Sequence, residues 1–250
     1  MLYKKASISL INNYLCNMFY KVIISILLIT LIAVSCGKDP VEPTYYDNEF
    51  KYFPLETGSF IDYEVTEIYI DKPSNIYDTT NYYMRWQVDI PFIESSGDSA
   101  YRIEILKCFN NNTFEITDIW SAKLINNRAE LFEENLRIVN IRFPLLIDKQ
   151  WDCNVYNSNP PKVIKIAGID EHKQINNIGY DSVLTIIHDA DSSIIHKLLS
   201  YEQYAYGIGL VYKEITDISS QEIEPGVPLE NRITTGTIYK LKCFDYGTVN

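Results

Sequence analysis

From residue 51 onward, hydrophobic and polar residues alternate along the chain with a period of two. The segment 82–90 shows this most clearly. Its even-numbered residues, from Tyr82 to Ile90, are all apolar or aromatic, whereas the odd-numbered residues after Tyr83 are polar. Successive side chains on a β-strand point to opposite faces, so this pattern predicts a strand with one buried face.

Other segments are rich in Ile, Val, Thr and aromatic residues, which favour β-structure. They predict strands at residues 60–70, 101–109, 114–125, 128–132, 136–143, 162–169, 182–188, 194–201, 209–215 and 235–244. Asn126-Asn127 fits a tight hairpin turn because asparagine tolerates positive φ, and Asp189–Ser192 is expected to form another turn. Residues 129–135 are the best candidate for a helical turn, but we expect strand there as well.

About ten strands joined mostly by short turns predict an all-β fold with a single antiparallel domain. We expect a curved sheet that closes to a barrel or half-barrel, and the alternative is a two-sheet sandwich. A short internal echo, Phe53-Pro54-Leu55 and Phe143-Pro144-Leu145, suggests a duplication of about 90 residues.

The N-terminal segment has a different pattern. Residues 22–34 form an uncharged apolar run, which is preceded by lysines and followed by Ser35 and Cys36. This run is too short for a spanning helix, which needs about 20 residues, so it indicates a signal peptide over residues 1–35. Translation could start at Met1 or at Met18.

The segment also resembles a bacterial lipoprotein signal, which implies cleavage before Cys36 and acylation of that cysteine. The alternative is an ordinary cysteine after an uncleaved anchor helix. Residues 36–50 then form the lipidated cysteine and a flexible tether, and residues 51–250 form the single all-β domain.

The formal net charge is −11, and the predicted leader contains lysines but no acidic residue, so the remaining body is more acidic still. An acidic body lacks the basic surface of a nucleic-acid binder, and anionic lipid surfaces repel it. We therefore expect no nucleic-acid partner and attachment to the membrane through the lipid alone. The expected location is the bacterial cell envelope, at the outer membrane, on either its periplasmic or its surface side.

Three cysteines lie in the predicted body: Cys108, Cys153 and Cys243. They allow one disulfide at most, and the sequence does not determine the pairing. None belongs to a C-x-x-C motif, so a zinc site or a redox motif is not indicated.

Two groups of residues are candidate sites. His188, Asp189, Asp191 and His196 would flank a hairpin turn and form a weak candidate for a metal site, although a solvated turn explains them better and no metal is expected.

The second group is Tyr204, Tyr206, Gly207 and Gly209. If this segment were a strand, both glycines would face one side, which produces either a bend or bulge, the favoured interpretation, or a notch that holds a ligand. The chain contains 20 tyrosines, which suit sheet packing and also binding surfaces.

Several segments resemble a group of Bacteroidetes envelope lipoproteins of unassigned activity. They are Tyr52–Leu55 with Gly58, Ser99–Glu104, Asn127–Glu130, Glu133–Arg137, Phe143–Leu145 with Trp151, and Tyr204–Glu214. The resemblance implies an envelope lipoprotein and supplies no activity.

The sequence contains no nucleophile elbow, zinc-protease, P-loop or dinucleotide-binding motif. We therefore expect a non-enzymatic, lipid-anchored protein without a cofactor that has a binding or structural role. Candidate partners are an envelope protein, a glycan or a lipid. The alternative is a carrier of a lipid or hydrophobic ligand in an open barrel, and a hydrolase with an unrecognised site is the third possibility.

Overall fold

The computed structural model describes residues 46–109 and 113–249. The predicted signal peptide, Cys36 and residues 37–45 of the predicted tether lie outside these residues, whereas residues 46–50 of that tether form helical turns. Within the described part of the chain, none of the helices has the length and apolar character required to cross a membrane.

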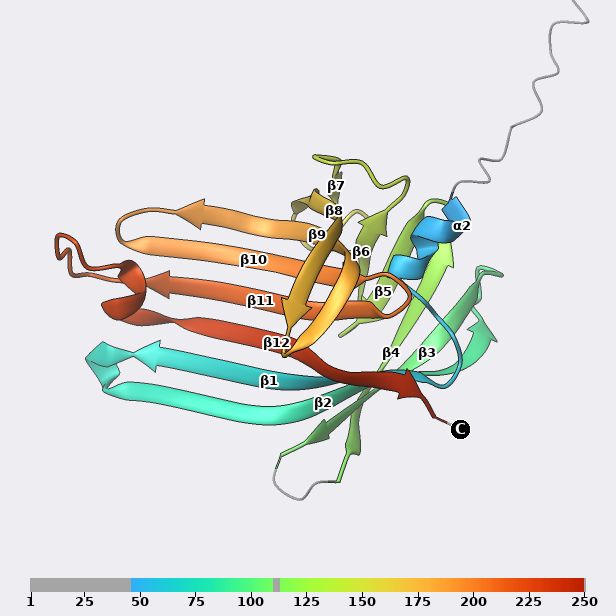
Figure 1. The fold of residues 1–250 in the computed structure, drawn as a ribbon, viewed down its shortest axis with the longest axis horizontal. Coiled ribbons are helices and arrows are strands. Elements are labelled where there is room, and N and C mark those ends of the chain that lie inside the picture. Colours follow the sequence, from blue (N-terminus) through green and yellow to red (C-terminus); the bar gives the residue numbers. More distant parts are fainter. Residues whose placement is uncertain (1–45, 110–112, 250) are drawn as a thin grey trace, which may run out of the picture. The chain divides into compact units, whose positions relative to one another are not determined.

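Twelve strands and a few short helical turns make up the described residues (Figure 1). The helical elements are α2 (Tyr46–Glu49), η1 (Phe50–Tyr52), η2 (Lys72–Ser74) and η3 (Leu229–Asn231). The strands are β1 (Ser59–Asp71), β2 (Ile76–Ile93), β3 (Ser99–Cys108), β4 (Glu115–Ile125), β5 (Arg128–Glu133), β6 (Leu136–Arg142), β7 (Gln150–Asp152), β8 (Val163–Ile175), β9 (Ile178–Ser192), β10 (His196–Ala205), β11 (Gly209–Ser219) and β12 (Thr235–Thr248).

All twelve strands form one antiparallel sheet in the order β6-β5-β4-β3-β2-β1-β12-β11-β10-β9-β8-β7. The sheet therefore consists of two six-stranded meanders, β1–β6 and β7–β12, which are joined where β1 pairs with β12. Phe53-Pro54-Leu55 precedes the first strand of one meander, and Phe143-Pro144-Leu145 precedes the first strand of the other. The two copies of the sequence echo thus occupy corresponding positions in the topology.

The two edges of this sheet, β6 and β7, meet and nearly close it into a barrel. The Val139 amide donates a hydrogen bond to the Cys153 carbonyl at 3.0 Å, and the Trp151 indole Nε1 donates to the Val139 carbonyl at 2.8 Å. The predicted all-β fold with a curved sheet is confirmed, and the flat-sandwich alternative is not observed.

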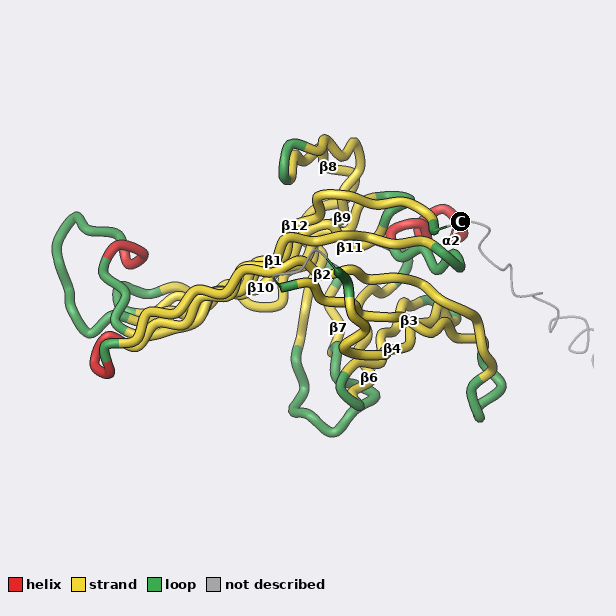
Figure 2. The backbone as a smooth tube through the Cα atoms, turned by 90° about the horizontal axis from the view of Figure 1, so that it is seen from below, coloured by secondary structure: helices red, strands yellow, loops and turns green. Residues whose placement is uncertain are grey.

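Some strands are longer than the barrel requires. Figure 2 shows long strands running away from the curved part of the sheet as a flat ribbon, at whose end two short helical turns lie. A small apolar cluster of Ile70, Ile218, Leu229 and Ile233 stabilises this ribbon. The main core lies in the barrel and includes the fully buried Phe143.

The predicted segments all fall within observed strands, except for terminal residues, and the turn at Asn126-Asn127 is confirmed, with Asn126 at φ 52°. The prediction of a turn at Asp189–Ser192 is wrong, because β9 continues through Ser192. The turn lies at residues 193–195, where the Ser193 hydroxyl accepts a hydrogen bond from the His196 amide at 3.0 Å.

Two further differences have local causes. Ile90 was expected on the buried face of its strand but is exposed, because a register shift between Val88 and Pro91 interrupts the alternation. Strand β7 was not predicted, since its three residues are too few to show a period.

Candidate functional site: a cavity inside the barrel

The barrel interior contains a cavity of about 210 Å³. Residues of strands β1 to β6 and β10 to β12 line it, so the site exists only because the sheet curls. Sites for drug-sized molecules occupy roughly 300–1,000 Å³, so this cavity suits a smaller ligand.

Five of the residues that line the cavity are aromatic. Tyr82, Met84 and Trp86 project into it from alternate positions of β2, and Tyr239 does so from β12. Trp86 also packs edge-to-face against Trp120 of β4, with ring centroids 5.8 Å apart. Rigid rings of this kind offer broad apolar contact to a ligand at a small entropic cost.

One side of the cavity is polar and centres on Glu202, whose side chain is only 4% exposed. Glu202 lies directly opposite Lys213 in the β10–β11 ladder, and Lys213 Nζ is 3.0 Å from Glu202 Oε1. The other carboxylate oxygen, Oε2, accepts a hydrogen bond from the Tyr204 hydroxyl at 2.6 Å and lies 3.3 Å from His188 Nε2.

These contacts set the charge of Glu202. Burial alone would raise the pKa of the Glu202 carboxyl, but Lys213, His188 and the Tyr204 hydroxyl together hold that pKa well below its ordinary value. Burial raises the pKa of Tyr204, and the Glu202 charge raises it further. Glu202 is therefore an ionised carboxylate at neutral pH, and Tyr204 is a neutral hydrogen-bond donor.

Glu133, the last residue of β5, lines the same cavity. Burial raises the pKa of its carboxyl, and the positive charge of Lys213 opposes this increase. Within the described part of the chain, no group donates a hydrogen bond to the Glu133 carboxylate. Glu133 is thus held near a cation but remains free to accept hydrogen bonds.

Asn140 adds a second free acceptor. Its side-chain Nδ2 donates to the Tyr204 hydroxyl at 3.4 Å, and that hydroxyl donates in turn to Glu202. Because the Tyr204 proton is already used, the amide must present its NH₂ group to Tyr204. The buried Oδ1 of Asn140 then has no partner among the described residues.

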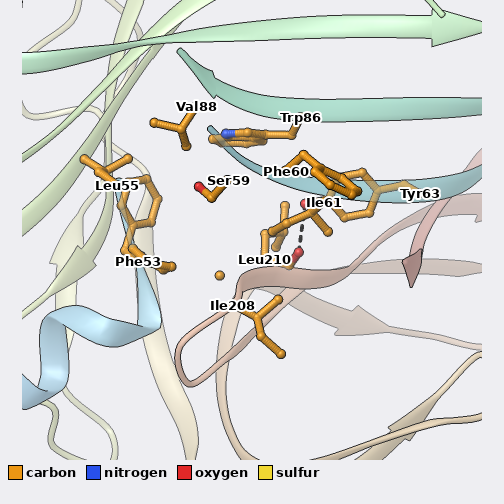
Figure 3. Close-up of a pocket in the computed structure, with 12 residues that line it drawn as sticks. Phe53, Leu55, Ser59, Phe60, Ile61, Tyr63, Trp86, Val88, Ile208 and Leu210 are labelled. Atoms are coloured by element: carbon orange, nitrogen blue, oxygen red, sulfur yellow. Dashed lines mark hydrogen bonds between the residues drawn. The ribbon is translucent and has the colours of Figure 1, made fainter. Parts of the chain in front are cut away.

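A smaller cavity of about 30 Å³ adjoins the first, and most of its lining residues are apolar (Figure 3). Phe53, Leu55 and Val88 are among its lining residues, and Trp86 and Leu210 line both cavities. Of the two hydroxyl groups in its lining, that of Ser59 donates to the Glu56 carbonyl and that of Tyr63 to the Leu210 carbonyl. The two cavities thus share a wall of one aromatic and one aliphatic side chain.

The residues predicted from the glycine-rich segment are divided among different places. Tyr204 lines the main cavity, and Gly209 lines the apolar one, where an added Cβ would lie 3.4 Å from Ile61 Cδ1. Tyr206 is exposed and packs edge-to-face on Tyr52. Gly207 lies in the turn between β10 and β11 with φ 76°, rather than in a strand, so the two glycines do not form a notch on one strand face.

The four residues of the weak metal candidate also have separate surroundings. His188 contacts Glu202, Asp189 Oδ2 lies 2.8 Å from Lys162 Nζ, and His196 Nε2 lies 3.1 Å from Asp217 Oδ1. Asp191 is exposed. Among the residues that the structure describes, no three His, Cys, Asp or Glu side chains are grouped so that they could hold a metal ion. The thiols of the three cysteines in the body are free and buried.

Sequence reasoning missed Glu133, Asn140, Glu202 and Lys213. A signal for Lys213 was present, because Lys213 occupies the same strand face as Val211 and Ile215 and interrupts an apolar series. A charge at such a position indicates a buried partner. The identity of that partner depends on strand pairing, which the sequence pattern does not give.

No protein-family model matches the chain, and none of the curated proteins matches it. Among solved structures, it is similar to a protein of Parabacteroides distasonis ATCC 8503 that is provisionally assigned as a lipoprotein. The two are 14% identical with a TM-score of 0.37, and the likeness covers 77% of this chain and 98% of the other. A likeness this distant gives no information about function, which has to follow from this chain's own residues.

Proposed function

We propose that the protein is a lipoprotein of the bacterial cell envelope, anchored to the outer membrane through Cys36, whose barrel binds a ligand without converting it. The internal cavity carries this proposal. It has room for a small ligand, aromatic side chains line it together with charged groups, and Asn140 presents a buried acceptor without a partner among the described residues.

The contacts of Glu202 disfavour a role for this carboxylate in hydrolysis. Hydrolysis by paired carboxylates requires an acid and a second carboxylate that can reach the substrate or a water molecule. Glu133 could be the acid, because burial raises its pKa. Both oxygens of Glu202, however, are engaged by Lys213, Tyr204 and His188. Glu202 is therefore unsuited to act as the second carboxylate of such a pair.

Native mass spectrometry of the protein extracted from its own membranes tests the binding role. We expect the wild-type protein to carry a small molecule and Leu210→Trp to lose it, because Leu210 lines both cavities. Ile116→Trp is the matched control, since Ile116 is exposed and outside the cavity lining. Equal occupancy in Leu210→Trp and the control, with both variants folded by circular dichroism, would contradict a site in the cavity.

The lining of the smaller cavity favours a second candidate, carriage of a lipid or another hydrophobic ligand, which would have to widen a space of about 30 Å³. Its lining offers aromatic and aliphatic contacts, and its hydroxyl donors are already used. Lipid that co-purifies with the wild-type protein and is lost on Ile208→Glu would favour carriage. Retention of the same lipid by Ile208→Glu would exclude this cavity as its site.

The anchor has its own test. Cys36→Ala is expected to abolish incorporation of labelled fatty acid, whereas Cys108→Ala, which changes a buried thiol, is expected to keep it. Normal labelling of Cys36→Ala would refute lipidation at this residue.

A further inference from the structure

The cavity also indicates which chemical class of ligand it accepts. We infer that the ligand is a primary ammonium ion with an aromatic or apolar group, held by Glu133 and Asn140 in the barrel cavity. This inference rests on the proposed binding function and specifies the ligand of the same site.

The first argument is charge. Five carboxylates line the cavity, against two ammonium groups, those of Lys107 and Lys213. Lys213 is engaged by Glu202, and Lys107 Nζ lies 5.5 Å from the centre of the Tyr82 ring. The negative charge of Glu133 is therefore only partly compensated. An anionic ligand would be repelled, whereas a cation would be attracted strongly in this partly desolvated space.

The second argument is the hydrogen-bonding capacity of the lining. Asn140 Oδ1 is a buried acceptor without a partner among the described residues, and no described residue donates a hydrogen bond to the half-buried Glu133 carboxylate. A buried acceptor without a partner is costly, so a ligand with N–H groups gains by satisfying Asn140 Oδ1 and adds a charge-assisted contact at Glu133. A primary ammonium group carries three donors and no acceptor, which matches this requirement.

The two acceptors belong to one neighbourhood. Both residues line the same cavity, Glu133 from β5 and Asn140 from the adjacent strand β6. In the proposed complex the ammonium group lies between them. The aromatic walls formed by Trp86 and Trp120 then face the remainder of the ligand, and aromatic faces attract cations in addition to providing apolar contact.

Calorimetric titration with four small probes separates charge from donor capacity. The probes are 2-phenylethylammonium, the neutral 2-phenylethanol, the anion 3-phenylpropionate and benzyltrimethylammonium, which is a cation without N–H donors. We expect 2-phenylethylammonium to bind about tenfold more tightly than the alcohol or the quaternary ion, which corresponds to one charge-assisted contact. The anion is expected not to bind.

Two variants locate the contacts. Glu133→Gln preserves shape and removes the charge, and we expect it to weaken 2-phenylethylammonium binding about tenfold while it leaves 2-phenylethanol unchanged. Asn140→Ala is expected to reduce the advantage of the primary over the quaternary ion. Glu115→Gln removes the same charge from an exposed position outside the cavity lining and is expected to have no effect.

The outcomes distinguish this inference from the proposed function. If the alcohol or the anion binds the wild-type protein as tightly as 2-phenylethylammonium, or if Glu133→Gln binds the ammonium probe normally, the ligand class is wrong although the cavity still binds. If none of the probes binds, or if Leu210→Trp binds the ammonium probe with unchanged affinity, the proposed function fails as well.

Discussion

Replacing Lys213 with methionine tests whether the ion pair between Lys213 and Glu202 stabilises the pairing of β10 with β11. Lys213→Met retains the apolar stem and removes the ammonium group that lies 3.0 Å from Glu202 Oε1. The Glu202 carboxylate, 4% exposed, then stays buried without its main counter-charge. The expected effect is a lower free energy of unfolding.

The size of this loss follows from the surroundings. Breaking a buried ion pair by removing one partner costs about 3–5 kcal/mol. The Lys213 side chain is 28% exposed, and His188 and Tyr204 still contact Glu202, so the lower limit, about 3 kcal/mol, applies here. In a body of this size, that loss lowers the melting temperature by about 6–12 °C.

Urea denaturation followed by circular dichroism measures the loss, provided that the slope with urea is unchanged. Lys240→Met is the matched control, because Lys240 forms a more exposed pair with Glu214 at 3.5 Å and should cost less than about 1 kcal/mol. The double variant Lys213→Met/Glu202→Gln should recover more than half of the loss. A loss below about 1 kcal/mol in Lys213→Met, or a double variant less stable than the single one, would refute the reasoning.

Three further predictions concern other parts of the fold. The three cysteines of the body should not react with a thiol reagent until urea is added, because they are buried and burial raises the pKa of Cys243 to about 11. Rapid labelling of the native protein would contradict this prediction. The pKa of Glu202 is depressed on folding, so its contribution to stability is present above its ordinary value of 4.5 and is lost as pH falls through the lower folded value. Unfolding curves should therefore lose stability below about pH 4.5 more steeply in the wild-type protein than in Glu202→Gln, and equal slopes would exclude this role. Gly236→Ala should lower the free energy of unfolding by about 2–3 kcal/mol in the same assay, because φ is 150° and the new Cβ would lie 2.3 Å from the Asp217 carbonyl oxygen. In the control Gly97→Ala, the new Cβ has no atom within 4 Å, so this variant should lose about 1 kcal/mol. Equal losses in the two variants would contradict the predicted clash.

The strands could be predicted from the sequence because the period of two is a local property. Where the chain departs from that period, prediction failed for local reasons. The bulge before Pro91 turns Ile90 outward, and the Ser193 hydroxyl fixes a turn beyond the acidic pair that was expected to form it. The order of the strands, with β6 meeting β7, depends on long-range pairing, and the sequence supported a barrel only as one of two arrangements.

Much less of the site could be predicted. Tyr204 was identified from its glycine-rich surroundings, but its role follows from the carboxylate that it contacts. Glu133 and Asn140 belong to neighbouring strands of one hairpin, whereas Lys213 lies far from them in the sequence and reaches the same cavity only because the sheet curls. None of these residues stands out in the sequence of its own strand. Their chemistry depends on a shared cavity, which no local sequence pattern predicts.

The central claim is that the barrel interior is a ligand site. A crystal structure of the protein extracted from its own membranes tests this most directly. The account predicts electron density for a bound molecule between Trp86 and the acceptors Glu133 and Asn140. A cavity filled by the protein's own side chains, or one that contains only water, would contradict it.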